Sequence, residues 1–494
     1  MALYIGLALF LVRRCFGAAV GTGVDLPGTL WWHQWTLHAV RTGSSPTQTP
    51  WFFHPEGADL FANSGANLVD GLLALPWLAA LGLPDYAAPF TVVLLLCNAL
   101  AMRTLLREHS RLACVAGAAL YEVHPFVLYE LGGGRPTQAL LCFLPLFLHF
   151  LFRGRGVLAG LMLAAQGWTY WFTGHFALLV LGPPLLYWAW RTQALKTLAI
   201  AAGSALVAVL PALVAMLLRA DQVPWYEGDP EGVLTTWTLW APMRGAYAPS
   251  AWGLLLTGAA LLGCRQRTLW IPAAALALLV CGGAMTGLGW LLPGFDRLLW
   301  PYRAAAMLAL VGAPALAEAL DRLPSLRWRA GGVVLAGLLG GTRSALPSTA
   351  IEEPSYAAAI QADPGVVLTL PWLCSSSTVH LQPLHGSPLL GGLGEENPVF
   401  VPQGVAEAVA ADPVLGVLAS VSRGGPPTQG EGPSIEGVRW VVLHREAYSP
   451  AQLRGRSCYQ GEVSGAEGRV NGFVQSRLGR PSLEDDQAVV WRLP

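Results

Sequence analysis

Charged residues are scarce in this chain of 494 residues. They account for 12% of it, whereas soluble domains carry about 25%. Hydrophobic residues make up 54%, so much of the surface faces something other than water, and a wholly soluble protein is excluded. The 30 basic and 30 acidic residues cancel. Without a basic excess we expect no nucleic-acid partner.

Several chemical motifs are also missing. The eight cysteines show neither a CxxC pair nor a Cys/His spacing, so we predict no zinc site. There is no GxxxxGK(S/T) loop, and the glycine run Gly132–Gly134 lacks the preceding strand that a dinucleotide loop needs. We therefore expect no cofactor, and an activated donor would arrive through the membrane.

Long apolar runs dominate the chain as far as residue 346. A helix needs about 20 apolar residues to cross the hydrocarbon layer of a membrane. Leu68–Leu83 is interrupted by Asp70 and Pro76, so we interpret it as a helix on or partly in the membrane, with a full span as the alternative. The sequence predicts about 11 transmembrane helices, at 1–20, 85–104, 111–130, 137–152, 156–172, 174–190, 197–218, 250–264, 269–289, 303–320 and 330–346.

Basic residues recur at intervals of two spans, which predicts the orientation of the chain. Because basic loops stay in the cytoplasm, the opposite loops face outwards. These outer loops include residues 21–84 and the hydrophilic residues 347–494, and they are rich in tryptophan, which favours the membrane interface. The basic clusters are Arg103 with Arg107 and Arg111, Arg153 with Arg155, Arg191 with Lys196, Arg265 with Arg267, and Arg322 with Arg327 and Arg329.

Residues 347–494 are predicted to form a soluble α/β domain outside the cytoplasm, and residues 1–346 a transmembrane domain. Short β-type runs occupy 365–370, 438–444 and 488–493, and residues 405–418 are typical of a helix. The domain contains Cys374 and Cys458. Two free thiols are the ordinary interpretation, and a disulfide is the alternative outside the cytoplasm.

The long outer loop at 21–84 carries a candidate catalytic acid. Loops of this length are usually functional or disordered, and the aromatic content argues against disorder. Asp25 follows the first span directly, where a carboxylate can accept a proton from a hydroxyl at a lipid headgroup. The alternative is that Asp25 caps a helix that starts near Pro27.

A second set of ionisable groups lies at the outer ends of later spans. Glu122 and Glu130 are candidate acids, and the glycine run before Arg135 allows close backbone approach to a ligand. Arg135, Arg244 and Arg303 are candidates for binding a phosphate or another anionic headgroup. His54 and Glu56, in the first loop, are candidate substrate contacts. Their spacing does not indicate a metal.

Four places in the chain resemble the GT-C superfamily of integral membrane glycosyltransferases, in particular bacterial relatives of the dolichyl-phosphate-mannose-type and arabinosyl-type enzymes. The order of these places and the predicted topology support the resemblance. They are the acid and aromatics of Gly21–Trp35, the segment from Phe52 through Asp59 to Pro76, the run from Tyr129 through Gln138 to Leu146, and Gly437–Arg445.

The resemblance implies an inverting transfer from a polyprenyl-phosphate sugar donor to an acceptor hydroxyl outside a bacterial cytoplasmic (inner) membrane. Asp25 matches the position of the first-loop catalytic base, and a second acid would map to Glu122 or Glu130. The acceptor stays open between glycan, lipid and protein. Two alternatives stay open as well: a transporter or flippase for a lipid-linked saccharide, for which Glu318 is the mid-span charge, and a catalytically silent scaffold of the same fold.

Overall fold

The protein is described from a computed structural model. It describes residues 1–60, 68–218, 267–282, 301–325, 345–395, 401–427, 434, 437–454 and 458–494. Contacts divide the chain into two compact units. The helical unit contains residues 1–23, 68–217 and the described residues from 267 to 350. The C-terminal unit contains residues 24–60 and the described residues from 351 to 494, so most of the predicted first loop packs with the C-terminal residues.

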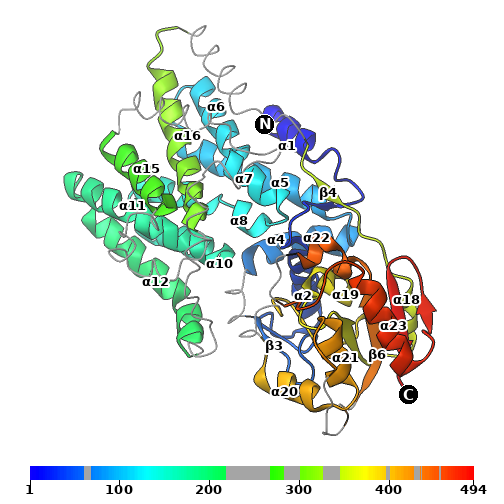
Figure 1. The fold of residues 1–494 in the computed structure, drawn as a ribbon. Coiled ribbons are helices and arrows are strands. Elements are labelled where there is room, and N and C mark those ends of the chain that lie inside the picture. Colours follow the sequence, from blue (N-terminus) through cyan, green and yellow to red (C-terminus); the bar gives the residue numbers. More distant parts are fainter. Residues whose placement is uncertain are drawn as a thin grey trace. The chain divides into compact units, whose positions relative to one another are not determined.

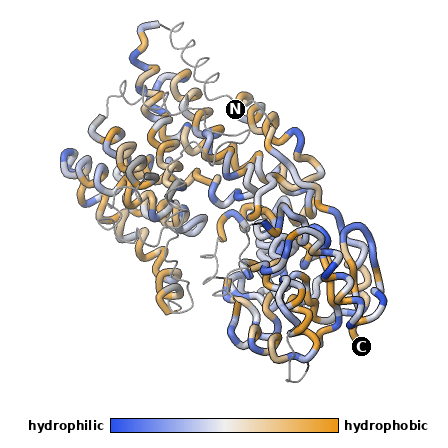
Figure 2. The backbone as a smooth tube through the Cα atoms, in the orientation of Figure 1, coloured by the Kyte–Doolittle hydropathy of each residue, from blue (hydrophilic) through white to orange (hydrophobic). Residues whose placement is uncertain are grey.

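The helical unit is built from apolar helices with few intervening residues. Figure 2 shows them mainly as hydrophobic segments. In chain order (Figure 1) they are α1 (Ala2–Val12), α4 (Leu68–Leu81), α5 (Ala87–Leu105), α6 (Arg111–Glu122), α7 (Pro125–Gly132), α8 (Pro136–Ala139), α9 (Phe143–Phe152), α10 (Gly156–Thr169), α11 (Trp171–Arg191), α12 (Leu195–Leu217), α15 (Arg267–Gly282), the 3-10 helix η5 (Pro301–Ala304) and α16 (Ala305–Asp321).

Four stretches of the described helices are long and apolar enough to cross a membrane, namely Ala87–Leu105, Arg111–Gly132, Trp171–Arg191 and Leu195–Ala215. The bent pair Gln403–Ala411 and Leu415–Ser422 would make five if it counted as one span. The chain is therefore a multi-pass membrane protein. The count of about 11 spans stays a prediction. The predicted span 250–264 lies outside the described residues, as does 330–346 except for its last two residues.

The first helix differs from the predicted span at 1–20. Helix α1 ends at Val12, and Arg13 and Arg14 follow it with exposed side chains. The Arg13 guanidinium lies 3.8 Å from the centroid of the Phe10 ring. A span that contains both arginines is therefore wrong. Charged groups are costly inside a membrane helix, and the helix ends before it would include them.

Small residues let two of the long helices approach closely. In α10, a Cβ atom on Gly156 would lie 2.7 Å from the carbonyl oxygen of Thr197, and one on Gly160 would lie 2.3 Å from that of Ala201. Both carbonyls belong to α12. Such contacts are how helices associate in lipid, where apolar side chains alone give no driving force.

The C-terminal unit contains a four-stranded sheet in the order β5-β6-β8-β7. Strand β5 (Val366–Leu370) is parallel to β6 (Val438–His444), which pairs antiparallel with β8 (Ala488–Arg492), and β7 (Leu483–Glu484) pairs with β8. The three longer strands lie within one residue of the predicted β-type runs. Every residue of β5 is buried, as expected for a strand covered on both faces.

The C-terminal unit also contains helices, and one of them, α2, comes from the predicted first loop. They are α2 (Leu26–Thr42), α18 (Tyr356–Ala362), α19 (Gln382–His385), α20 (Gln403–Ala411), α21 (Leu415–Ser422), α22 (Pro450–Leu453) and α23 (Ala466–Leu478). The single helix predicted at 405–418 is wrong, because the chain bends by 104° between α20 and α21. At the bend, the Asp412 carboxylate accepts hydrogen bonds from the backbone N–H groups of Val414 (2.9 Å) and Leu415 (2.7 Å), which starts a new helix.

Two of the first-loop tryptophans form part of the core of the C-terminal unit. Trp31 and Trp35 are buried and stack with their ring centroids 6.1 Å apart. Phe52 stacks on Trp31 at 4.0 Å, and the Trp31 indole N–H donates to the Gln382 amide oxygen at 2.9 Å. The prediction that these two rings lie at a membrane interface is therefore wrong, because protein side chains cover them.

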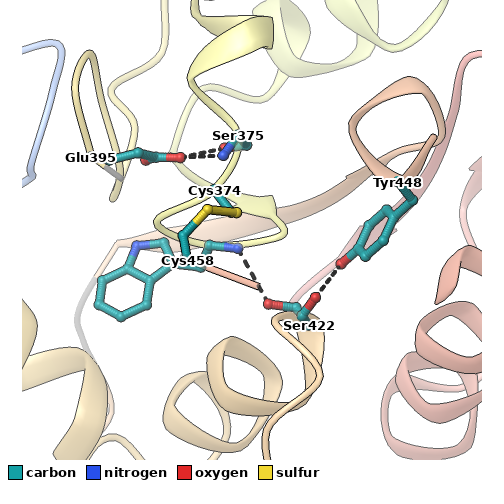
Figure 3. Close-up of a disulfide and its surroundings, with 7 residues drawn as sticks. Cys374, Ser375, Glu395, Ser422, Tyr448 and Cys458 are labelled. Atoms are coloured by element: carbon teal, nitrogen blue, oxygen red, sulfur yellow. Dashed lines mark hydrogen bonds between the residues drawn. A yellow bond between two sulfur atoms is a disulfide. The ribbon is translucent and has the colours of Figure 1, made fainter. Parts of the chain in front are cut away.

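A disulfide joins Cys374 to Cys458, with their Cα atoms 5.7 Å apart (Figure 3). The ordinary interpretation of two free thiols is therefore wrong, and the alternative of a disulfide is the one found. Hydrogen bonds hold the surrounding chain: the Tyr448 hydroxyl donates to the Ser422 carbonyl at 2.9 Å, and the Ser375 hydroxyl donates to the buried Glu395 carboxylate at 2.8 Å. The disulfide thus lies within an ordered polar network.

Buried histidines make the C-terminal unit sensitive to acid. Burial lowers the pKa of His385 to about 4, and burial together with neighbouring His380 and His385 lowers the pKa of His444 to about 3. In the unfolded chain both titrate at about 6.5. Between these values the unfolded state binds more protons, so stability is complete above pH 6.5 and falls as the pH drops towards 4.

We expect the unit to lose about 1.3 kcal/mol per histidine between pH 7.5 and 5.5. The measurement is the free energy of unfolding of the full chain in detergent, from hydrogen exchange of the β6 amides. His385→Asn can still accept the 3.2 Å hydrogen bond from the Ser387 N–H but does not titrate, so its pH dependence should be smaller. Equal stability of the wild-type protein at the two pH values would contradict this account.

Candidate functional site

Two glycine segments that the sequence singled out meet in the helical unit. The Thr22 N–H donates to the Gly132 carbonyl at 3.0 Å. A Cβ atom on Gly21 would lie 2.5 Å from the Gly134 nitrogen, and one on Gly23 would lie 2.2 Å from the Gly133 oxygen. Real Cβ atoms do not approach so closely, so the start of the first loop and the turn after α7 depend on glycine.

Glu130 and Arg135 form an ion pair beside this contact. The Glu130 carboxylate accepts from the Arg135 guanidinium; the side chain of Glu130 is fully buried and that of Arg135 is 13% exposed. The guanidinium also lies 5.3 Å from the centroid of the Tyr129 ring. A carboxylate held by an arginine is a weak proton acceptor. The ion pair therefore fits a role of Glu130 in stabilising the turn after α7 better than a role as general base.

Glu122 ends α6 and is also fully buried. Among the described residues, neither oxygen of its carboxyl group has a hydrogen-bond partner. A buried polar group without partners costs about 1–3 kcal/mol. General-base work requires a carboxylate within hydrogen-bond reach of its substrate, and no hydrogen-bonding group among the residues that the structure describes orients Glu122 for this.

Asp25 is the exposed member of the three predicted acids. It occupies the position before α2, whose first turn contains Pro27, so the helix begins where the sequence indicated. A helix-capping role would explain why Asp25 lies directly before α2, but its carboxylate makes no capping hydrogen bond. An exposed carboxylate is accessible to a substrate.

His54 and Glu56 belong to the C-terminal unit. The backbone N–H of His54 donates to the Leu389 carbonyl at 3.0 Å. Burial lowers the pKa of the His54 imidazole, which is therefore neutral at pH 7. Glu56 lies against the first turn of α20, where a Cβ on Gly404 would be 2.0 Å from its carboxylate oxygen. A carboxylate is stabilised at a helix N-terminus. In the described parts of the chain, no group of three or more possible metal ligands occurs.

Arg303 lies in η5 and is 9% exposed. Its guanidinium donates to the Tyr170 hydroxyl and lies 5.3 Å from the centroid of the Tyr170 ring. Tyr170 occupies the break between α10 and α11, with extended backbone angles. The predicted partner Arg244 lies outside the described residues. Of the two described candidate cations, Arg303 therefore contacts a neutral hydroxyl, whereas Arg135 contacts a carboxylate.

Solved structures with the same architecture exist. The arabinofuranosyltransferase AftD from mycobacteria matches 90% of this chain with a TM-score of 0.54 and 18% sequence identity. AftD is a GT-C superfamily membrane glycosyltransferase. This chain has a GT-C-like fold. It spans 35% of the length of AftD.

Two further GT-C structures are less similar. ArnT from Cupriavidus metallidurans, solved with undecaprenyl phosphate, has a TM-score of 0.43 and 12% identity, with 99% of this chain and 97% of ArnT covered. The oligosaccharyltransferase of Archaeoglobus fulgidus, solved with zinc and sulfate, has a TM-score of 0.48 and 13% identity, with 94% and 70% covered. No protein-family model and no curated protein matches the chain.

Within this GT-C-like fold, buried polar side chains that sequence reasoning missed support the irregular backbone after α8. Asn98 donates to the Ala139 carbonyl at 2.8 Å and accepts from the Leu141 N–H at 2.9 Å. The Tyr121 hydroxyl donates to the Leu141 carbonyl at 2.9 Å, and the Thr137 hydroxyl donates to the Asp70 carboxylate at 2.8 Å. These side chains could have been found as polar residues inside apolar runs. A polar side chain in a membrane helix is costly and is usually there for a structural or functional role.

Proposed function

We propose that this chain is a membrane glycosyltransferase that moves a sugar from a polyprenyl-phosphate donor to an acceptor hydroxyl, with inversion, on the extracytoplasmic face. The single observation that carries the proposal is the GT-C-like fold, matched by AftD over 90% of the chain. The sequence has no nucleotide-binding loop, which favours a donor that reaches the site through the bilayer. Asp25 is the proposed base, and Arg303 is the proposed cation for the lipid phosphate.

In the proposed reaction Asp25 accepts the proton of the acceptor hydroxyl. The oxygen attacks the anomeric carbon, a new glycosidic bond forms, and the bond to the lipid phosphate breaks with its electron pair on the phosphate oxygen. One displacement inverts the anomeric centre. Phosphate is a good leaving group whose charge needs a cation, so one carboxylate suffices, in contrast to the pair that glycoside hydrolases use.

The disulfide supports an extracytoplasmic C-terminal unit. Disulfides persist in oxidising compartments and are rare in the cytoplasm, and Cys374 is bonded to Cys458. The spacing of the arginine clusters also supports this orientation. A reporter that is active only in the cytoplasm should stay silent when it is fused after Pro494. Strong reporter activity would sink this orientation.

The transporter alternative has Glu318 as its main candidate residue. Glu318, in α16, is buried and accepts a 3.3 Å hydrogen bond from the Trp270 indole of α15. This contact gives Glu318 a role in helix packing. The deciding experiment is an assay of the purified protein with radiolabelled polyprenyl-phosphate sugars. Transfer of label to an acceptor supports the transferase, whereas label carried across vesicles without bond cleavage would support the transporter.

Arg303 provides a separate prediction about donor binding. A charged hydrogen bond contributes about 1.5–3 kcal/mol, so Arg303→Ala should weaken the affinity for a polyprenyl-phosphate sugar by about 10- to 100-fold. Arg303→Lys keeps the charge but loses the planar fork, and should lie between. Tyr170→Phe, which removes the hydroxyl contact but keeps the cation, is the matched control, and titration in detergent measures the dissociation constants. Unchanged donor affinity in Arg303→Ala would assign Arg303 to structure instead.

A further inference from the structure

Three helix interruptions are connected inside the helical unit. The first is Leu140, which ends α8 with extended backbone, and the second is Tyr170, between α10 and α11. The third is η5, which precedes α16. The Gln166 amide N–H donates to the Leu140 carbonyl at 3.0 Å, and Arg303 donates to the Tyr170 hydroxyl. Irregular backbone in a membrane protein is tolerated where protein buries it or where it lines a polar cavity.

Polar atoms without partners lie close in sequence to the first two of these interruptions. In the described parts of the chain, the side-chain amide oxygens of Gln138 and Gln166 and the indole nitrogen of Trp171 are buried and have no hydrogen-bond partner. Gln138 is 7% exposed and Gln166 is fully buried. The orientation of the Gln166 amide follows from its bond to Leu140, because a carbonyl only accepts, so its NH₂ group must face that carbonyl. Its oxygen therefore points elsewhere.

The chemistry of these atoms favours a ligand whose groups both donate and accept hydrogen bonds. Two amide oxygens accept hydrogen bonds and one indole nitrogen donates. An ionised phosphate or carboxylate only accepts, so it gives an amide oxygen nothing, and a lipid tail satisfies none of the three. A sugar ring carries several hydroxyls, each of which both donates and accepts. The set therefore fits a polyhydroxylated ring.

We propose that Gln138 and Gln166 form a hydroxyl-binding subsite for the sugar ring of the lipid-linked donor. The subsite rests on the proposed function and deepens it, because it assigns sugar recognition to the α8 and α10 interruptions. Gln138 lies two residues before Leu140, whose carbonyl accepts from Gln166, and Gln166 lies one helical turn before Tyr170, the contact of Arg303. Recognition of the ring is thus assigned to uncharged side chains, one of which lies close in sequence to the contact of the proposed phosphate-binding arginine.

The test measures what the sugar adds to binding. The probes are pentaprenyl phosphate alone and pentaprenyl phosphate carrying mannose or arabinofuranose, titrated into the full chain in detergent. In the wild-type protein at least one sugar probe should bind about 10-fold or more tightly than the bare lipid phosphate. Gln138→Met and Gln166→Met keep the side-chain volume but remove the acceptor. Each should reduce that ratio by about 2- to 10-fold, the value of one hydrogen bond, and leave the affinity for the bare lipid unchanged.

Gln193→Met is the matched control, because Gln193 is exposed in the turn after α11, and its ratio should equal that of the wild type. Gln166 also holds the Leu140 carbonyl, so if Gln166→Met does not fold, Gln138→Met carries the test. The subsite is overturned if neither sugar adds affinity in the wild type, or if the ratio is unchanged in Gln138→Met. Transfer is not the readout: a protein that binds the sugar but transfers none ends the transferase proposal and keeps the subsite.

Discussion

Asp25→Asn is expected to lower sugar transfer by about 10²–10⁴-fold, the usual contribution of a general base. The amide has the size of the carboxylate but cannot accept a proton. Donor affinity should survive, because the proposed cation for the phosphate is Arg303. A loss of helix stability cannot produce this result, since Asn caps a helix as well as Asp does and the Asp25 side chain makes no capping bond. Turnover and donor titration on one purified sample separate the two effects.

Asp486→Asn is the matched control for this substitution. Asp486 is another exposed aspartate of the C-terminal unit, and its replacement should leave turnover at the wild-type level. A folded Asp25→Asn protein with normal turnover would remove Asp25 from the mechanism. Glu122 and Glu130, both of which are buried, would then be the next candidates for the base. A wild-type protein without any turnover would instead support the silent scaffold.

Removal of the disulfide is expected to have the largest effect on stability. Cys374 and Cys458 are separated by 84 positions in the sequence, and a loop of this length restricts the unfolded chain by about 4–5 kcal/mol in the entropic model. The double variant Cys374→Ala/Cys458→Ala should lose a large part of this free energy. Since marginal stability is about 5–15 kcal/mol in total, we expect the C-terminal unit to open readily at 37 °C.

Hydrogen exchange of the full-length variant gives the measurement. Amides of β5 and β6 should exchange much faster than in the wild type, whereas those of α5 and α6, in the helical unit, should change little. Cys97→Ala removes a half-buried free thiol of the helical unit and serves as the control. Unaltered exchange of the β6 amides in the double variant would show that the covalent link contributes little.

Local patterns in the sequence identified much of the fold. The runs of β-branched residues at Val366–Leu370 and Val438–His444 are strands because such side chains suit a covered pleated surface, and the long apolar runs are helices. The break in the predicted helix 405–418 had a local signal that was overlooked. Pro413 follows Asp412, an acidic side chain that readily bonds to nearby backbone N–H groups.

Long-range contacts could not be predicted in this way. Trp31 was expected at a membrane interface on composition, but its partner Gln382 is 351 positions away, and no periodicity shows such a pairing. The Glu130–Arg135 pair is similar, because its spacing of five residues does not place two side chains on one face of a regular helix. The pair meets because α7 ends at Gly132 and, in the turn that follows, the Arg135 backbone N–H donates to the Glu130 carbonyl at 2.8 Å.

The division of the C-terminal unit into two distant pieces of chain has a consequence during synthesis. About 290 residues separate residue 60 from residue 351, and a ribosome adds roughly 5–20 residues per second. The aromatic cluster around Trp31 and Trp35 therefore waits about 15–60 s before the first residues of the second piece, at residue 351, are made. Throughout that interval these aromatic side chains lack the cover that the C-terminal residues give them. A chaperone that binds exposed aromatic segments would therefore act on residues 24–60 during this interval.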